Sequence, residues 1–151
     1  MFNIRGLYLV LLSITLLSSC RDYEYIVDDP LRPFVDEYFQ ILKDNNIRFK
    51  KKDFIVILSD ELIGTPFAGF ADGMFDKERV RVLVHPEYWN SLSNKQKKIL
   101  IFHELSHDIF DSLHTNTVFL MQPKMHSRFV AENINWDWAV SELVKYIKDE
   151  R

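Results

Sequence analysis

The sequence predicts an α+β fold, on three observations that concern different parts of the 151-residue chain. Apolar residues recur at helical spacing near the start of the chain and again over residues 94–110 and 136–147. A short unbroken apolar run at 54–58 and alternating valines at 79–85 are typical of β-strands. We therefore expect one domain in which a small twisted sheet packs on two helices, followed by a C-terminal helix.

The first predicted helix has a single apolar face. The apolar residues of this face lie three or four positions apart or side by side, and they are Phe34, Val35, Tyr38, Ile41 and Leu42. Asn45 and Asn46 follow as a stop signal. The run from Phe54 to Leu58 is rich in β-branched residues, and it predicts a buried strand.

Glycines are concentrated between the two predicted strands. Residues 64–73 hold three glycines and a proline, which predicts a loop or a loose hairpin. Over 79–85 valines alternate with other residues, so we expect a strand with one buried face that ends at Pro86.

Capping signals mark the starts of the last two helices. Ser93 and Gln96 have the spacing of a capping box, which predicts a helix from about Asn94 to Phe110. Asn135 is the expected N-cap of the final helix. The core-facing stripe of that helix consists of Trp136, Val140, Leu143, Val144 and Ile147.

The N-terminal residues have the pattern of an export signal. Arg5 precedes an apolar stretch at 7–17 that is shorter than the roughly 20 residues a membrane-spanning helix needs. The stretch ends in small residues before Cys20, the only cysteine of the chain, and this sequence resembles a bacterial lipobox. An ordinary secretory signal with a chance cysteine is the rival interpretation.

This pattern divides the chain into three expected parts. Residues 1–19 are a predicted lipoprotein signal peptide, and residues 20–32 are the lipidated Cys20 with a flexible tether. Residues 33–151 form the folded domain. The expected location is the bacterial cell envelope, with the membrane as a partner through the lipid anchor.

The charge balance argues against a nucleic-acid partner. The formal net charge is −3, so the chain has no surplus of basic residues to neutralise phosphates.

The most specific motif is His103-Glu104-Leu105-Ser106-His107 within the predicted helix. Residues four positions apart share a helix face, so His103 and His107 can converge on one ion. Glu104 stands beside the first ligand and can accept a proton from a zinc-bound water, whose pKa the metal lowers to about 7. Two surface histidines at a coincidental spacing are the alternative to this Zn²⁺ site.

Three residues are candidates for the third metal ligand. His114 follows shortly after the predicted helix end, while Glu132 and Glu142 lie further along the chain. Asp108 and Asp111 are too close along the helix to complete a tetrahedral site and are expected to support it or to face solvent.

The segment from His103 to Met121 resembles the metzincin class of zinc peptidases, and the chain is similar to small lipoprotein metallopeptidases of bacterial envelopes. The resemblance implies a zincin-like fold, His114 as third ligand and Met121 as the methionine turn beneath the metal. It also implies that the strand at 79–85 is the edge strand beside the cleft, to which an extended peptide substrate adds.

The chain departs from the metzincin pattern after the helix. Phe110 stands where that pattern has glycine, and Leu113 stands where it has the third histidine, so His114 is one residue late. A turn that is one residue longer can still bring His114 to the metal if Asp111 or Ser112 takes the left-handed conformation.

The expected function is therefore zinc-dependent hydrolysis of peptide bonds in a peptide or protein substrate, with Glu104 as the general base. Two alternatives stay open: a thermolysin-like enzyme with Glu132 or Glu142 as third ligand, and a non-catalytic lipid-anchored binding protein that retains a zinc site. The sequence does not predict an oligomeric state.

Overall fold

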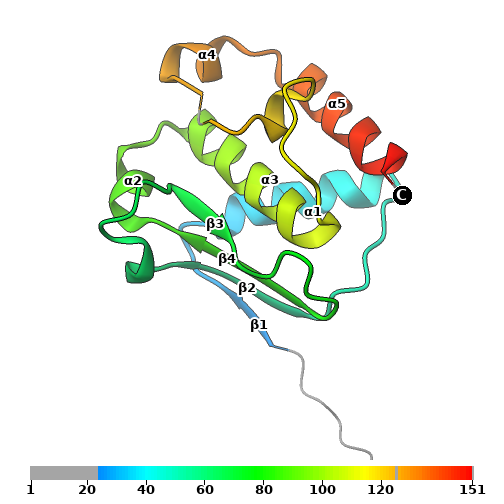
Figure 1. Cartoon of the computed structure of the whole chain (residues 1–151). Coiled ribbons are helices and arrows are strands. Elements are labelled where there is room, and N and C mark those ends of the chain that lie inside the picture. Colours follow the sequence, from blue (N-terminus) through cyan, green and yellow to red (C-terminus); the bar gives the residue numbers. More distant parts are fainter. Residues whose placement is uncertain (1–23, 125, 151) are drawn as a thin grey trace, which may run out of the picture.

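The computed structural model describes residues 24–124 and 126–150, and these residues form an α+β fold, as predicted. Within them a sheet of four strands is accompanied by five helices (Figure 1). The strands are β1 (Tyr25–Val27), β2 (Asp53–Leu58), β3 (Gly69–Ala71) and β4 (Arg79–Val84). The helices are α1 (Arg32–Asp44), α2 (Pro86–Ser91), α3 (Asn94–Phe110), α4 (Arg128–Asn133) and α5 (Trp136–Asp149).

The sheet has the order β1-β2-β4-β3, in which only β3 runs antiparallel to its neighbour. The prediction that the strand at 79–85 is an edge strand was wrong, because β4 lies between β2 and β3. Val80, Val82 and Val84 are fully buried, as expected for a strand paired on both sides. The glycine-containing segment instead supplies the edge, through the short strand β3.

The predicted tether over 20–32 was also wrong for the residues that the structure describes. Tyr25–Val27 form β1, which pairs in parallel with β2, and Leu31 is fully buried. Three residues are too few to show a strand periodicity, and their pairing partner lies almost 30 positions away, so no local signal marks them. The folded domain therefore begins before residue 33.

The N-terminal predictions concern residues that lie outside this description. The signal peptide at 1–19 and the lipidation site Cys20 belong to residues 1–23, about which the structure gives no information. Across residues 24–124 and 126–150, every helix is too short or too polar to traverse a bilayer.

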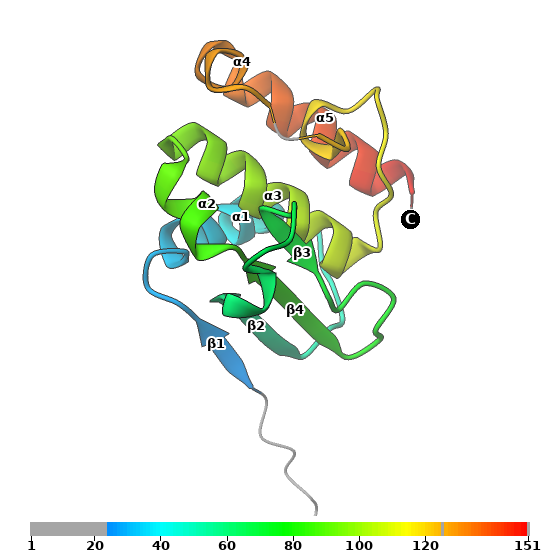
Figure 2. The ribbon, with the colours of Figure 1, turned by 60° about the vertical axis from the view of Figure 1, so that its left-hand side comes forward.

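Helix α3 packs against β3 and β4 and against α1, and both helices lie on the same side of the sheet (Figures 1 and 2). The predicted capping box is present: Gln96 N–H donates to Ser93 Oγ at 3.3 Å, and Ser93 N–H donates to Gln96 Oε1 at 3.1 Å. Phe102 and Leu105 are fully buried, and the Tyr38 hydroxyl bonds the Ser106 hydroxyl at 2.9 Å. These contacts fix α3 relative to the core.

The C-terminal part lies over the side of α3 that faces away from the sheet (Figure 1). Asn135 caps α5 as predicted, because its Oδ1 accepts from Trp138 N–H at 3.0 Å. Leu143, Val144 and Ile147 are buried, and α5 packs on a short 3₁₀ turn at Phe119–Met121. This packing holds the turn against α3.

Candidate metal centre

The three histidines of the sequence motif come from one helix and the turn after it. His103 and His107 lie on consecutive turns of α3. Asp111 then adopts the left-handed conformation, with φ 54° and ψ 27°, as the turn chemistry predicted. The N–H of the next residue, Ser112, donates to the Ser106 carbonyl at 3.4 Å, which reverses the chain and returns His114 to the other two histidines.

The Nε2 atoms of the three histidines converge. His103 Nε2 lies 3.0 Å from His107 Nε2 and 3.2 Å from His114 Nε2. Three imidazole nitrogens around a tetrahedral ion with metal–N distances of 2.0–2.1 Å would be roughly 3.3 Å apart. The spacing therefore fits three ligands of one metal ion, and residues 24–124 and 126–150 contain no other group of three such side chains.

Backbone carbonyls set the tautomer of the two helical histidines. His103 Nδ1 lies 2.8 Å from the Leu120 carbonyl oxygen, and His107 Nδ1 contacts the Ser112 carbonyl oxygen. A carbonyl oxygen only accepts hydrogen bonds, so each Nδ1 carries the proton and each Nε2 presents a lone pair. This is the usual support of a metal-binding imidazole.

Burial keeps the same two imidazoles neutral. Desolvation, together with the neighbouring His107, lowers the pKa of His103 to about 3. Burial also lowers the pKa of His107 from its ordinary value. A metal ion binds the neutral imidazole, so these groups need lose no proton on binding near neutral pH.

Glu104 lies between α3 and the edge strand β3. Its carboxylate accepts a hydrogen bond from Ala71 N–H, and a Cβ placed on Gly69 would lie 2.8 Å from Glu104 Cγ. Burial, followed by the charge of Asp108, raises the pKa of Glu104 to about 8. A carboxyl group with a pKa near neutrality can both accept and return a proton.

These groups line a cleft of about 590 Å³ between β3 and the C-terminal segment. His103, Glu104, His107 and His114 all face it, and its remaining lining is mostly apolar. Four large apolar side chains on its border are exposed to solvent: Phe67, Phe70, Phe75 and Leu113. The cleft thus joins a polar centre to apolar walls.

The structure does not bring the alternative ligands to the histidine pair. Glu132 is exposed on α4 and Glu142 is half-buried on α5, and neither lines the cleft. Met121 is fully buried in the turn below α3, and its carbonyl accepts from Thr115 N–H at 3.0 Å. This bond ties the segment with His114 to the turn.

Sequence reasoning missed the groups that hold the histidines in place. They include the carbonyls of Ser112 and Leu120, for which no sequence signal exists because every residue has a carbonyl. Tyr146 on α5 donates from its hydroxyl to the Leu113 carbonyl at 3.1 Å. Lys51 contributes an ammonium group to the same region, and only its burial reveals this role.

Comparisons with known proteins found no matching protein family, no matching curated protein and no matching solved structure. The site is therefore interpreted from its own geometry. Three converging imidazoles with a carboxyl group beside them in an accessible cleft could hold a divalent metal ion.

Proposed function

We propose that this chain is a zinc-dependent metallopeptidase with a zincin-like, metzincin-type arrangement. The observation that carries the proposal is the convergence of three Nε2 atoms beside the buried carboxyl group of Glu104 in one cleft. Catalytic zinc sites use three protein ligands and keep the fourth position open, whereas structural sites fill all four. The cleft side of the histidine group carries no fourth protein ligand among the described residues.

Each residue has a distinct role in this proposal. His103, His107 and His114 would hold the metal, which when bound supplies a Lewis acid that activates water and polarises a carbonyl group. Glu104 accepts a proton from the attacking water and delivers it to the leaving amine. Met121 supports the site from below by packing, and its complete burial agrees with this role.

The edge strand offers a binding site for an extended substrate backbone. Ala68 and Asp72 hydrogen-bond to β4, since His85 N–H donates to Ala68 and Asp72 N–H donates to Arg81. Bonded pairs alternate along an antiparallel ladder, so the N–H and C=O groups of Gly69 and Ala71 point away from β4. Ala71 N–H already bonds Glu104, and the remaining groups are available to a peptide that adds as a strand.

The lipid anchor at Cys20 and a location in the bacterial cell envelope complete the proposal. They rest on the sequence pattern of residues 1–20 alone. Labelling of the protein with a radioactive or clickable fatty acid in cells would test them, and a Cys20→Ala variant that still incorporates the label would contradict them.

Peptide hydrolysis is tested with a Glu104→Gln variant. Glutamine keeps the shape and can still accept from Ala71 N–H, but it cannot take a proton. We expect the variant to bind one zinc per chain and to cleave unfolded protein substrates at least about 100-fold more slowly than the parent, because general-base catalysis contributes roughly 10²–10⁴-fold. Full activity in the zinc-loaded variant would contradict the mechanism.

A further inference from the structure

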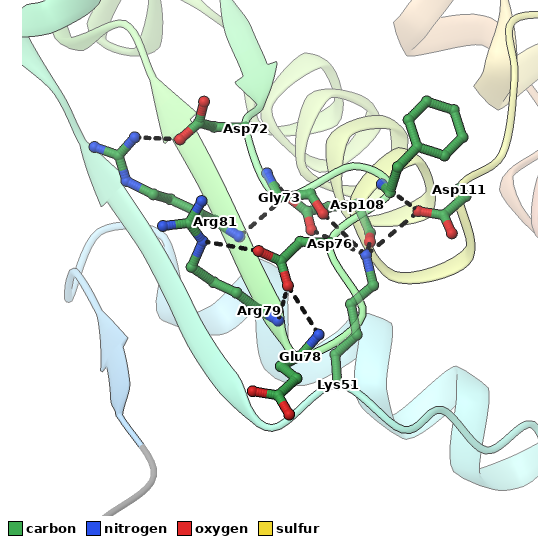
Figure 3. Close-up of polar contacts among 10 residues, drawn as sticks. Lys51, Asp72, Gly73, Asp76, Glu78, Arg79, Arg81, Asp108 and Asp111 are labelled. Carbon is green, nitrogen blue, oxygen red and sulfur yellow. Dashed lines mark hydrogen bonds and ion pairs between the residues drawn. The ribbon is translucent and has the colours of Figure 1, made fainter.

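Lys51 is an almost buried lysine that the proposed chemistry does not use. It precedes β2, and its side chain is only 7% exposed. Its Nζ donates to the Gly73 carbonyl at 3.0 Å and also to the Asp108 carbonyl. The carboxylates of Asp108 and Asp111 lie 3.7 Å and 3.4 Å from the same atom. Figure 3 shows the ammonium group among these oxygens.

Three of these four contacts are to oxygens at the C-terminal end of α3. The last four carbonyls of a helix lack partners within the helix, and the end carries a partial negative charge. Lys51 satisfies the carbonyl of Asp108, the residue directly after His107. The ammonium group therefore stabilises the last helical turn, on which a proposed metal ligand stands.

The carboxylates of Asp108 and Asp111 also hold the hairpin between β3 and β4. Asp108 Oδ2 accepts from Gly73 N–H at 2.8 Å and from Arg81 N–H at 3.0 Å. Asp111 Oδ1 accepts from Phe75 N–H at 2.6 Å. The two carboxylates that Lys51 pairs with thus bind the hairpin backbone directly, as Figure 3 shows.

The hairpin is also held within itself. Asp72 pairs with Arg81, and Asp76 Oδ1 accepts from the N–H groups of Glu78 and Arg79 at 2.8 Å and 3.0 Å. These internal bonds hold the hairpin together where it contacts the C-terminal end of α3. Phe75 of the hairpin borders the cleft, so the contact between the hairpin and α3 also positions one wall of the proposed substrate site.

The segment 111–115, which carries His114, starts at this junction. Asp111 is fastened to Lys51 and Phe75, and the Ser112 carbonyl contacts His107 Nδ1. At the other end of the segment Thr115 N–H bonds the Met121 carbonyl. Lys51 contacts the start of this segment, at Asp111, three residues before His114.

We propose that Lys51 is a positioning residue of the metal centre, which fixes the segment carrying His114 and joins it to the edge hairpin. The inference rests on the proposed metal site but not on its hydrolytic activity. Removing the ammonium group leaves the Asp108 and Asp111 carboxylates close together without a cation, so the turn at Asp111 loosens and His114 is no longer held at the ligand position.

The test compares zinc affinity in Lys51→Met and in the matched control Lys50→Met, which removes an exposed lysine from the same run. Competition with a chromophoric chelator measures the dissociation constant of each purified protein. We expect Lys51→Met to bind zinc about 10–100-fold more weakly than the parent, the usual effect of losing an outer support of a metal site. Lys50→Met should equal the parent.

A double-mutant cycle separates positioning from general damage. If Lys51 acts through His114, adding Lys51→Met to a His114→Ala variant should weaken its residual zinc binding by less than about threefold. Asp111→Gly keeps the left-handed backbone but removes the carboxylate, so it should weaken zinc binding to the same extent as Lys51→Met. It replaces Lys51→Met in the test if that variant does not fold.

The possible outcomes distinguish this inference from the proposed function. Unchanged zinc affinity in the folded Lys51→Met variant, or an equal loss with and without His114, overturns the positioning role. If Lys51→Met does not fold, unchanged affinity in Asp111→Gly overturns it. Normal zinc binding by a parent that hydrolyses nothing contradicts the peptidase proposal and leaves the affinity comparison intact, whereas a parent that binds no zinc contradicts both.

Discussion

Gly69 of the edge strand lies directly against Glu104 of helix α3, so closely that a Cβ at position 69 would stand 2.8 Å from both Cγ and Oε1 of the glutamate. Real Cβ atoms essentially never approach other atoms within 3.0 Å, so a side chain at this position displaces the carboxyl group. The absence of a side chain at Gly69 is thus a condition for the position of the proposed general base.

A Gly69→Ala variant should therefore lose activity while keeping its metal. A displacement of about 1 Å can lower a rate about 100-fold, and we expect a loss of this order in peptide hydrolysis. Zinc content should stay at one per chain, because the three histidines are untouched. Ala71→Gly, which removes a methyl group from the same strand, is the control. Equal activity of Gly69→Ala and the parent would contradict the close packing.

The raised pKa of Glu104 predicts how stability depends on pH in the metal-free protein. Glu104 titrates near 4.5 when unfolded but near 8 in the fold. The unfolded state therefore loses its proton first, and this group makes the parent less stable as pH rises from about 4.5 to 8. Glutamine has no proton to lose, so the stability of Glu104→Gln relative to the parent should increase across the same range.

Urea unfolding at pH 4.5, 6 and 8 measures this difference, with a chelator present throughout. Glu132→Gln is the matched control, because it makes the same substitution at an exposed position on α4. A constant difference between Glu104→Gln and the parent at all three pH values would show that the carboxyl group is not buried in this way.

Metal binding should stabilise the folded chain. A ligand present at 100 times its dissociation constant adds about 2.7 kcal/mol to the free energy of unfolding, which for a domain of this size is a rise in Tm of about 5–10 °C. Differential scanning calorimetry with and without zinc measures the shift, and a chelator should reverse it. His114→Ala should show a much smaller shift at the same zinc concentration. No shift in the parent would mean that no site forms.

Local signals predicted much of the site, because its helix is specified within a short stretch of sequence. The capping box at Ser93 and the helical spacing placed His103 and His107 correctly on one helix. The left-handed turn at Asp111 followed from the tolerance of aspartate for that conformation. These features depend on neighbours along the chain, and sequence patterns record such neighbours well.

Features that depend on distant segments were not predictable. The strand at 79–84 has the pattern of a half-buried strand, yet its place inside the sheet depends on its pairing with β3, which is too short to recognise. The preference for His114 over Glu132 or Glu142 came from the resemblance and not from a local pattern, because the position of His114 depends on how the turn returns to α3. Lys51 lies in a run of three lysines that reads as solvent-exposed, and only the folded structure buries one of them.

The most direct test of the account is the zinc content of the purified protein, compared with its His114→Ala, Glu132→Ala and Glu142→Ala variants. Atomic absorption or mass spectrometry of the native protein gives the number of zinc ions per chain. We expect one zinc in the parent and in both glutamate variants, and little or none in His114→Ala. Retention of zinc by His114→Ala with loss in a glutamate variant would contradict the three-histidine site, and a parent without zinc would contradict the metal centre itself.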